Sequence, residues 1–197
     1  MSKSEKILEK YFSSVSDEKK EKILKLSDVY REVNNKINII SRADIENVLE
    51  KHILTALSIA RAKKFRNGAK VLDIGSGGGL PGIPLSIIFE DCKFTLSDSR
   101  KKKCEAMEMA LEELNLKNVE IINKRSNEIK EKFDFVVGRA VTEPSEFMKL
   151  AKKNLKVKDG QAFYISGDNE NYNGSKIAIS DIYDEEYFEN KYIYVYP

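Results

Sequence analysis

A glycine-rich segment at residues 71–82 has the residue types and spacing with the clearest chemical meaning in this chain. It reads VLDIGSGGGLPG, a short apolar run followed by closely spaced glycines. Glycines after a buried strand let the backbone approach a ligand that a Cβ atom would exclude. In parallel α/β sheets such a turn lies at the carboxyl end of a strand, where nucleotides bind. The segment therefore predicts a nucleotide-type site that includes Gly75, Gly77, Gly79 and Gly82.

Two residues in this segment discriminate between classes of nucleotide ligand. Residues 77–82 match the G-x-G-x-x-G pattern of dinucleotide-binding proteins, which is a weak signal by itself. Asp73 would repel a pyrophosphate, and Pro81 removes a backbone N–H that a phosphate would use. S-adenosylmethionine carries an ammonium and a sulfonium group and no phosphate, so these residues favour it. Asp98, at the end of the next predicted strand, is placed for ribose hydroxyls in either case.

The elements that position these residues alternate between strand and helix from residue 70 onward. Apolar runs predict strands at 71–75, 93–98, 119–123, 133–138, 161–166 and 192–196, and helices at 84–89, 101–116 and 144–155. This alternation predicts an α/β fold with a doubly wound, mostly parallel sheet. Residues 168–190, rich in Asn, Asp and Glu, predict a surface loop with one short helix.

The first third of the chain has a different pattern. Residues 5–66 show helical spacing of apolar residues, with no glycine or proline before Gly68. We therefore predict an N-terminal helical region, residues 1–67, that packs on the core of a domain formed by residues 68–197. The helical region carries fifteen Lys and Arg against ten Asp and Glu, whereas the whole chain has a net charge of +2. A basic surface of this kind is a weak indication of a polyanionic partner.

The composition excludes several classes of protein. With 197 residues, 41% of them hydrophobic and 34% charged, the chain can form one hydrophobic core with a polar surface. Two cysteines and one histidine exclude a disulfide framework and a typical zinc site. The sequence shows neither a membrane-length apolar stretch nor an export signal at its start, so we expect a cytoplasmic protein.

Several sequence blocks, taken in order, are similar to those of one known family. They are NKINI at 35–39, KHILTAL at 51–57, DIGSGGGLPGIP at 73–84, DS at 98–99 and GRA at 138–140. These blocks resemble motifs of the small-subunit ribosomal RNA guanine-N7 methyltransferases of bacteria, also called the glucose-inhibited division protein B family. The glycine-rich run is specific, and the other blocks extend the resemblance over about residues 20–165.

The resemblance implies a class I S-adenosylmethionine-dependent methyltransferase fold, Rossmann-like, with an N-terminal helical extension. It implies S-adenosyl-L-methionine as methyl donor and a guanine in the decoding-region loop of 16S rRNA as acceptor. By matching position, Gly75 and Leu80 should line the cofactor pocket, and Asp98 should contact the ribose. Ser126 and Asn127 fall where the family contacts the adenine.

The chain departs from the family pattern at three places. Many members have an acidic residue at the position of Asn127, and many have a lysine at the position of Ser166. The usual basic C-terminal end is replaced by residues 194–197, YVYP. These departures leave the cofactor loop untouched and indicate that contacts to the substrate have moved.

Methylation at guanine N7 fits a site without a nucleophile–base pair. N7 already has a lone pair in the ring plane, so the reaction needs alignment and desolvation more than proton transfer. Arg139 falls where the family holds an arginine on the cofactor or substrate side, and it could bond guanine O6 or a phosphate. Methylation of exocyclic amines or of pyrimidine C5 is disfavoured, because Gly138-Arg139-Ala140-Val141 lacks the usual amine-methylating motif and both cysteines lie away from the strand tips.

Three further features are candidates for positioning an RNA substrate. His52 lies on a predicted helix between apolar residues, which favours a packed side chain over a role at the RNA. Arg100 and Lys101 open a run of four cations at a helix start, where positive charge opposes the macrodipole. Arg125 lies beside the predicted adenine contacts, where a structural and a substrate-facing role are both open.

These features predict methyl transfer to 16S rRNA within the 30S subunit or an assembly intermediate, by a monomer with no membrane association and no metal. A class I methyltransferase with another acceptor, such as a protein or small metabolite, is the first alternative. A non-catalytic module that binds RNA or cofactor is the second. Because the basic region is small, we expect the substrate to be a folded particle.

Overall fold

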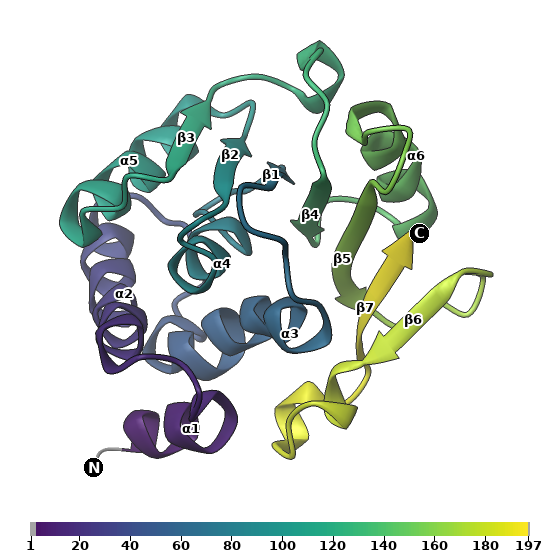
Figure 1. Cartoon of the computed structure of the whole chain (residues 1–197). Coiled ribbons are helices and arrows are strands. Elements are labelled where there is room, and N and C mark those ends of the chain that lie inside the picture. The colour runs from purple at the N-terminus through teal and green to yellow at the C-terminus, as the bar shows by residue number, and fades with distance from the viewer. Residues whose placement is uncertain (1–2, 197) are drawn as a thin grey trace.

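The computed structural model describes residues 3–196, and within that range seven strands form one sheet in the order β3-β2-β1-β4-β5-β7-β6 (Figure 1). Strands β1 to β5 run parallel to one another, and β7 runs antiparallel to both β5 and β6. The strands span Lys70–Ile74 (β1), Lys93–Ser97 (β2), Val119–Ile122 (β3), Phe135–Arg139 (β4), Gln161–Gly167 (β5), Ser175–Ala178 (β6) and Lys191–Tyr196 (β7). The predicted α/β class and mostly parallel sheet are confirmed.

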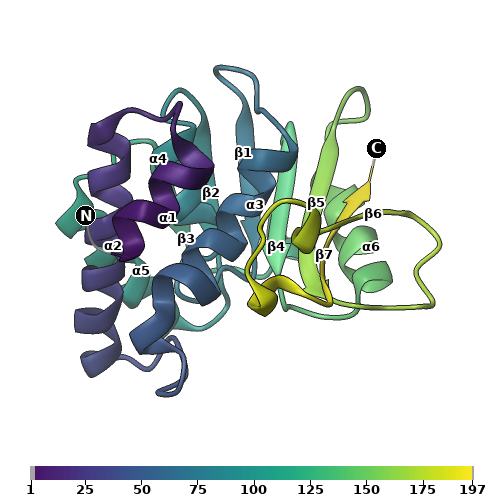
Figure 2. The same cartoon turned by 90° about the horizontal axis from the view of Figure 1, so that it is seen from below.

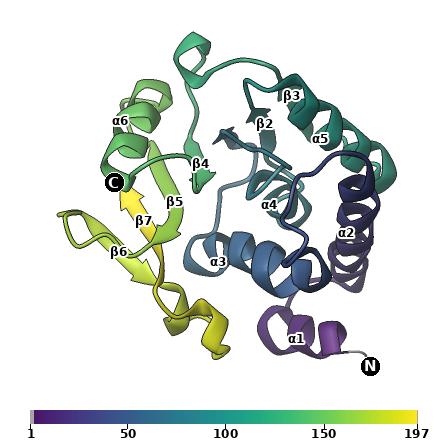
Figure 3. The same cartoon turned by 180° about the vertical axis from the view of Figure 1, so that it is seen from behind.

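Helices cover both faces of the sheet (Figures 2 and 3). The N-terminal helices and the helices that connect β1 to β2 and β2 to β3 contact one another on one face of the sheet. Helix α6 packs with a second apolar cluster on the other face. The helices span Lys3–Phe12 (α1), Asp17–Lys36 (α2), Thr55–Ala62 (α3), Gly82–Ile88 (α4), Lys101–Leu114 (α5) and Pro144–Asn154 (α6). Because side chains alternate along a strand, Val71 joins the first cluster and Leu72 the second.

The N-terminal helices share a hydrophobic core with the sheet. Leu26 and Tyr30 of α2 are fully buried in the same cluster as Phe94 of β2. Between α2 and α3 the chain forms a short turn, Ile45–Asn47, and a π-helical segment, Leu49–Leu54. The boundary at residue 67 between a helical region and a methyltransferase domain stays a prediction.

The structure differs from the sequence-based expectation near the C-terminus. Residues 168–190 were expected to form a surface loop with one short helix, but Ser175–Ala178 pair with β7 as strand β6. Two single turns, Ile179–Asp181 and Glu186–Phe188, follow β6. Strand β6 has only four residues, Ser-Lys-Ile-Ala, which are too few to show a clear alternation, so only its pairing with β7 makes it a strand. In the described part of the chain no helix is both long and apolar enough to cross a membrane.

Candidate functional site

The glycine loop joins β1 to α4 and is closed by the carboxylate of Asp73. Asp73 is fully buried, and its Oδ2 accepts hydrogen bonds from the Gly82 N–H, at 2.8 Å, and from the Ser76 hydroxyl. A Cβ atom on Gly82 would lie only 2.8 Å from that oxygen, so a larger residue would displace the carboxylate. Asp73 therefore ties the end of the strand to the first turn of the next helix.

The second carboxylate oxygen of Asp73 has a different environment. Oδ1 is buried and has no hydrogen-bond partner among residues 3–196. Burial raises the pKa of Asp73 to about 7, although the bonds from Ser76 and Gly82 and the charge of Arg139 oppose this increase. A buried acceptor without a donor is costly, so this oxygen is suited to a cationic ligand group such as an ammonium.

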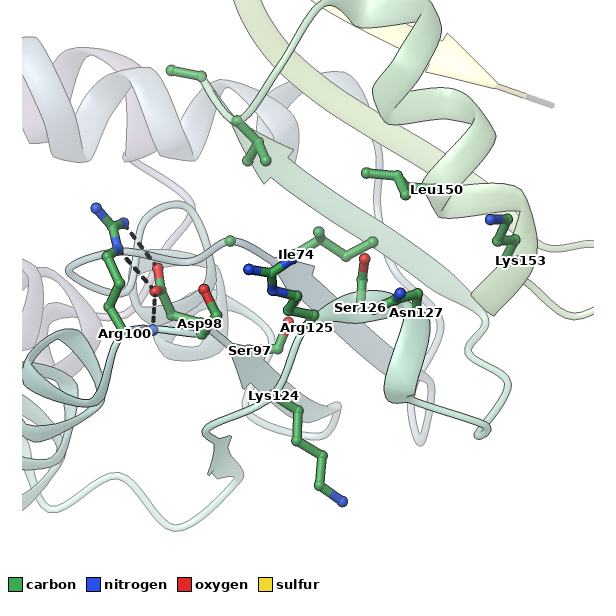
Figure 4. A pocket seen from close by; sticks show the side chains of 14 residues that line it. Ile74, Ser97, Asp98, Arg100, Lys124, Arg125, Ser126, Asn127, Leu150 and Lys153 are labelled. Carbon is green, nitrogen blue, oxygen red and sulfur yellow. Dashed lines mark hydrogen bonds and ion pairs between the residues drawn. The ribbon is translucent and has the colours of Figure 1, made fainter.

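Asp98 follows β2 and holds the other side of the loop (Figure 4). Its carboxylate accepts the backbone N–H of Gly77 at 3.0 Å and that of Arg100 at 2.9 Å. The Arg100 guanidinium also donates to both oxygens, each at 3.1 Å. Burial would raise the pKa of Asp98, but the bonds from Arg100 and Gly77 outweigh it and hold this pKa below its ordinary value.

A cavity of about 630 Å³ opens at the carboxyl ends of β1, β2 and β4. Of the sequence-predicted site residues it brings together Gly75, Asp98, Arg100, Arg125, Ser126 and Asn127. Ser126 and Asn127 form a single turn, Ser126–Glu128, that faces the cavity in Figure 4. The lining residues that sequence reasoning missed are Ile74, Ser97, Ser99, Lys124, Ala140, Val141, Leu150 and Lys153.

Some of the missed residues had a sequence signal. Leu150 and Lys153 are three residues apart on α6, so they share one face of a predicted helix that begins just after the Arg139 motif. Val141 directly follows that motif and contacts the position of a Cβ on Gly75 at 2.9 Å. Which face of α6 meets the cavity depends on the packing of the whole sheet.

The remaining predicted residues lie outside the cavity lining, and the buried Asp73 and Gly82 are among them. Gly77, Gly79 and Leu80 form the turn between β1 and α4, where Gly77 has a φ of +58° and open space around a Cβ position. Lys101 opens α5 and, with Arg100, lines a second groove.

Arg139 is the last residue of β4 and lies apart from the cavity lining, in contact with His52. Its guanidinium donates to the carbonyl oxygen of His52 at 3.2 Å and to His52 Nδ1. Arg139 and His52, both predicted from the sequence, are therefore direct partners. Tyr30, which the sequence did not single out, is fully buried and within electrostatic range of Arg139.

These residues fit S-adenosylmethionine. Asp98 lines the cavity, and its carboxylate could bind a ribose diol in place of the Arg100 guanidinium. The Ser126–Asn127 turn offers a hydroxyl and an amide to an adenine edge. The orphaned Oδ1 of Asp73 suits the ammonium of the methionine part, and the open space at Gly77 leaves room for a ligand. No acidic or histidine cluster that could hold a metal ion occurs within residues 3–196.

Comparison with solved structures agrees with this fold. The chain is similar to MtNAS in complex with MTA and tNA, with a TM-score of 0.60, 16% identity and coverage of 87% of this chain and 69% of that one. It is also similar to a SAM-dependent methyltransferase from Aquifex aeolicus, with a TM-score of 0.52, 19% identity and coverage of 74% and 76%. The fold is therefore the Rossmann-like fold of class I methyltransferases, with the cavity at the carboxyl ends of its parallel strands.

Sequence comparison gives the family. The family model described as rRNA small subunit methyltransferase G matches residues 19–184. A Bacteroides fragilis protein named ribosomal RNA small subunit methyltransferase G is 39% identical over 198 residues, covering 94% of this chain and 96% of the relative. The Bacteroides thetaiotaomicron protein of the same name is 45% identical over 156 residues, covering 79% of this chain and 76% of the relative. The chain belongs to the rRNA small subunit methyltransferase G family.

Proposed function

We propose that this chain transfers a methyl group from S-adenosylmethionine to N7 of a guanine in the decoding-region loop of 16S rRNA. The observation that carries the proposal is the family match over residues 19–184, which contains every residue that lines the cavity. The sequence resemblance had already implied this reaction.

The site supports an acceptor that needs no deprotonation. When bound, the cofactor supplies an electrophilic methyl group on a sulfonium. Guanine N7 has an available lone pair, so the chain has only to bind, align and exclude water. In this role Asp98 would hold the ribose, and Ser126 and Asn127 the adenine. Asp73, buried beneath the glycine-rich turn, would attract the ammonium through its charge.

Cysteine-dependent methylation of pyrimidine C5 is disfavoured by the two thiols. Cys92 and Cys104 are both buried, and burial raises the pKa of each, which makes thiolate formation harder. Cys104 lies nearer the strand ends than the sequence indicated, because its thiol donates to the Asp98 carbonyl oxygen at 3.5 Å. That contact directs the thiol to the backbone beneath Asp98.

Cations around the cavity support an RNA substrate. Arg100, Lys124, Arg125 and Lys153 line the cavity itself. A neighbouring groove between the end of α2 and the start of α5 is lined by further cations, Lys36, Lys101, Lys102 and Lys103, together with Arg100. Three lysines in the first turn of α5 face an unfavourable macrodipole, which an RNA phosphate would relieve. We infer that the RNA backbone follows this groove to the cavity.

The proposal extends to the particle and the place of action. The exposed cations contact backbone phosphates more readily than base edges, so recognition would depend on the shape of a folded 30S subunit or assembly intermediate. The chain would act as a monomer in the cytoplasm, where ribosomes assemble.

The test combines the purified chain, radiolabelled S-adenosylmethionine and 30S particles from a strain that lacks the corresponding enzyme. We expect label in 7-methylguanosine after digestion of the 16S rRNA, and slower transfer to protein-free 16S rRNA. Label in another nucleoside or in a ribosomal protein would contradict the acceptor. Cofactor binding with no transfer would indicate a non-catalytic binding module.

A further inference from the structure

The guanidinium of Arg139 is buried and is held by uncharged groups. Its side chain forms no salt bridge within residues 3–196, and both of its hydrogen bonds within that range go to His52. Burial lowers the pKa of Arg139, whereas Tyr187, Tyr30 and Asp73 act to raise it. A guanidinium has five N–H donors, so three of those on Arg139 have no partner within residues 3–196.

His52 contacts Arg139 in a defined tautomer. Because arginine can only donate, Nδ1 of His52 must be the acceptor, and the ring proton must be on Nε2. Burial and the charge of Arg139 lower the pKa of His52 to about 4, so the ring is neutral at pH 7. Nε2 is buried and has no hydrogen-bond partner within residues 3–196, so the Asp44 carboxylate, whose Oδ2 is 3.9 Å away, favours an N–H there only through its charge. Lys51, bound to Asp44 at 2.6 Å, is the other charged group facing this ring.

The backbone around His52 supports the same contact. His52 lies in the π-helical segment Leu49–Leu54, and its carbonyl oxygen accepts from Arg139 as well as from the Thr55 N–H. Single π-helical turns are rare and occur frequently at functional sites. The Tyr187 hydroxyl donates to the Lys51 carbonyl oxygen at 3.1 Å and holds the C-terminal segment against this turn.

We propose that His52 is the positioning residue for Arg139, an inference that rests on the function proposed above. Its imidazole and its carbonyl oxygen hold one side of the guanidinium. The remaining N–H groups are thereby presented to a ligand oxygen. That oxygen belongs either to the cofactor carboxylate or to O6 of the target guanine, which share this acceptor chemistry. With 14% of its side chain exposed, His52 acts through Arg139 and does not need to contact RNA itself.

A pair of amide variants tests the role of the ring nitrogen. In His52→Asn the side-chain oxygen can replace Nδ1, whereas in His52→Gln the amide reaches toward the Nε2 position. We expect His52→Asn to keep kcat/KM on 30S particles within about threefold of wild type. His52→Gln and His52→Leu should lose at least about tenfold, roughly 1.4 kcal/mol, at a similar free energy of unfolding. Equal losses in Asn and Gln, or no loss in Leu, would overturn the proposal.

Binding of S-adenosylhomocysteine separates the two ligand oxygens. If the Kd for S-adenosylhomocysteine rises in His52→Gln by the same factor by which kcat/KM falls, Arg139 is assigned to the cofactor carboxylate. An unchanged Kd with the same loss of kcat/KM assigns it to the guanine. Arg139→Lys serves as the reference. When it is combined with His52→Asn or His52→Gln, the difference in kcat/KM between these two His52 variants should vanish.

A spectroscopic measurement keeps this inference separate from the proposed function. His52 is the only histidine in the sequence, so ¹⁵N-labelled histidine gives the signals of one imidazole. We expect the Nε2–H tautomer at pH 7 and a change in its signals in Arg139→Lys. An Nδ1–H tautomer would overturn the contact even if methyl transfer is confirmed. The predicted tautomer with no methyl transfer would leave the contact intact and contradict the function.

Discussion

Two buried aspartates at opposite ends of the parallel strands, Asp73 and Asp134, have opposite environments. Asp134 precedes β4, and both its oxygens are paired: Oδ1 with Arg66 and with Lys156 at 2.7 Å, Oδ2 with the Lys70 N–H at 2.8 Å. Burial would raise the pKa of Asp134, but these partners outweigh it and hold the pKa below its ordinary value. Asp73 has one orphaned oxygen and a pKa raised to about 7.

This difference separates an acid that stabilises the fold from one that is suited to a ligand. The pairs of Asp134 contribute to the folded state, since its charge is compensated by the chain itself. The charge of Asp73 is only partly compensated, which destabilises the free protein and leaves interaction energy available for a cationic group. The end of the sheet where the cavity lies is therefore the end where a buried acid is incompletely satisfied.

The largest expected effect is that of Asp73→Asn on cofactor binding. We expect the Kd for S-adenosylhomocysteine to rise at least about 100-fold, because the neutral amide loses its attraction for the ammonium. At pH 8 the variant should be more stable than wild type, on the order of 2–4 kcal/mol, since the folded pKa of Asp73 lies above the unfolded value. Calorimetric titration and urea unfolding measure the two quantities.

The sign of the pH dependence follows from the raised pKa. The cost of the Asp73 charge is present above pH 7 and disappears as pH falls from about 7 to about 4. The stability difference between Asp73→Asn and wild type should shrink over this window. A variant less stable than wild type at pH 8, or one with unchanged affinity, would show that Asp73 stabilises the fold alone.

Asp134→Asn should have the opposite signature. We expect a loss of about 2 kcal/mol in the free energy of unfolding at pH 7, because Arg66 and Lys156 lose a charged partner. The pKa of Asp134 is lowered, so its contribution is present above its unfolded pKa and is lost as pH falls through the folded value. The Kd for S-adenosylhomocysteine should stay unchanged. Weaker cofactor binding in this variant would contradict the separation of roles.

Two glycines with the same backbone strain provide a smaller test. Gly77 and Gly68 have φ values of +58° and +74°, and a Cβ on either would meet no atom within 4 Å. Alanine at each position should cost about 1 kcal/mol of stability. Only Gly77→Ala should weaken cofactor binding, by about tenfold or more, because the added methyl enters space that the ligand needs. Equal affinities for the cofactor in the two variants would show that the cofactor does not occupy the space beside Gly77.

The smallest effect is expected for single surface cations. Lys101→Gln should weaken binding to 30S particles two- to threefold and lower the slope of log affinity against log salt by about one. Lys158→Gln is the matched control, because Lys158 is also exposed but precedes β5 at the opposite end of the strands. Binding measured at several salt concentrations compares them. An equal loss of affinity in Lys158→Gln would contradict the proposal that the RNA backbone follows the groove beside α5.

Much of the candidate cofactor site could be predicted because it is local in sequence. Asp73 lies near the end of β1, the glycines follow β1 and Asp98 follows β2, so the alternation of apolar runs was enough. The contact of His52 with Arg139 spans 87 residues and depends on how the helices pack on the sheet. The partners of Asp134 come from residues 66, 70 and 156, which no local pattern connects. Strand β6 likewise needed its long-range partner β7.

The most direct test is a ¹³C NMR titration of the aspartate side-chain carboxyls, with Asp73 and Asp134 assigned through their Asn variants. In the free protein we expect Asp73 to titrate near pH 7 and Asp134 below the ordinary aspartate value. Saturation with S-adenosylhomocysteine should lower the pKa of Asp73 by about one unit or more and leave Asp134 unmoved. A pKa of Asp73 that is already low in the free protein, or that does not respond to the ligand, would contradict the assignment of this carboxylate to the cofactor.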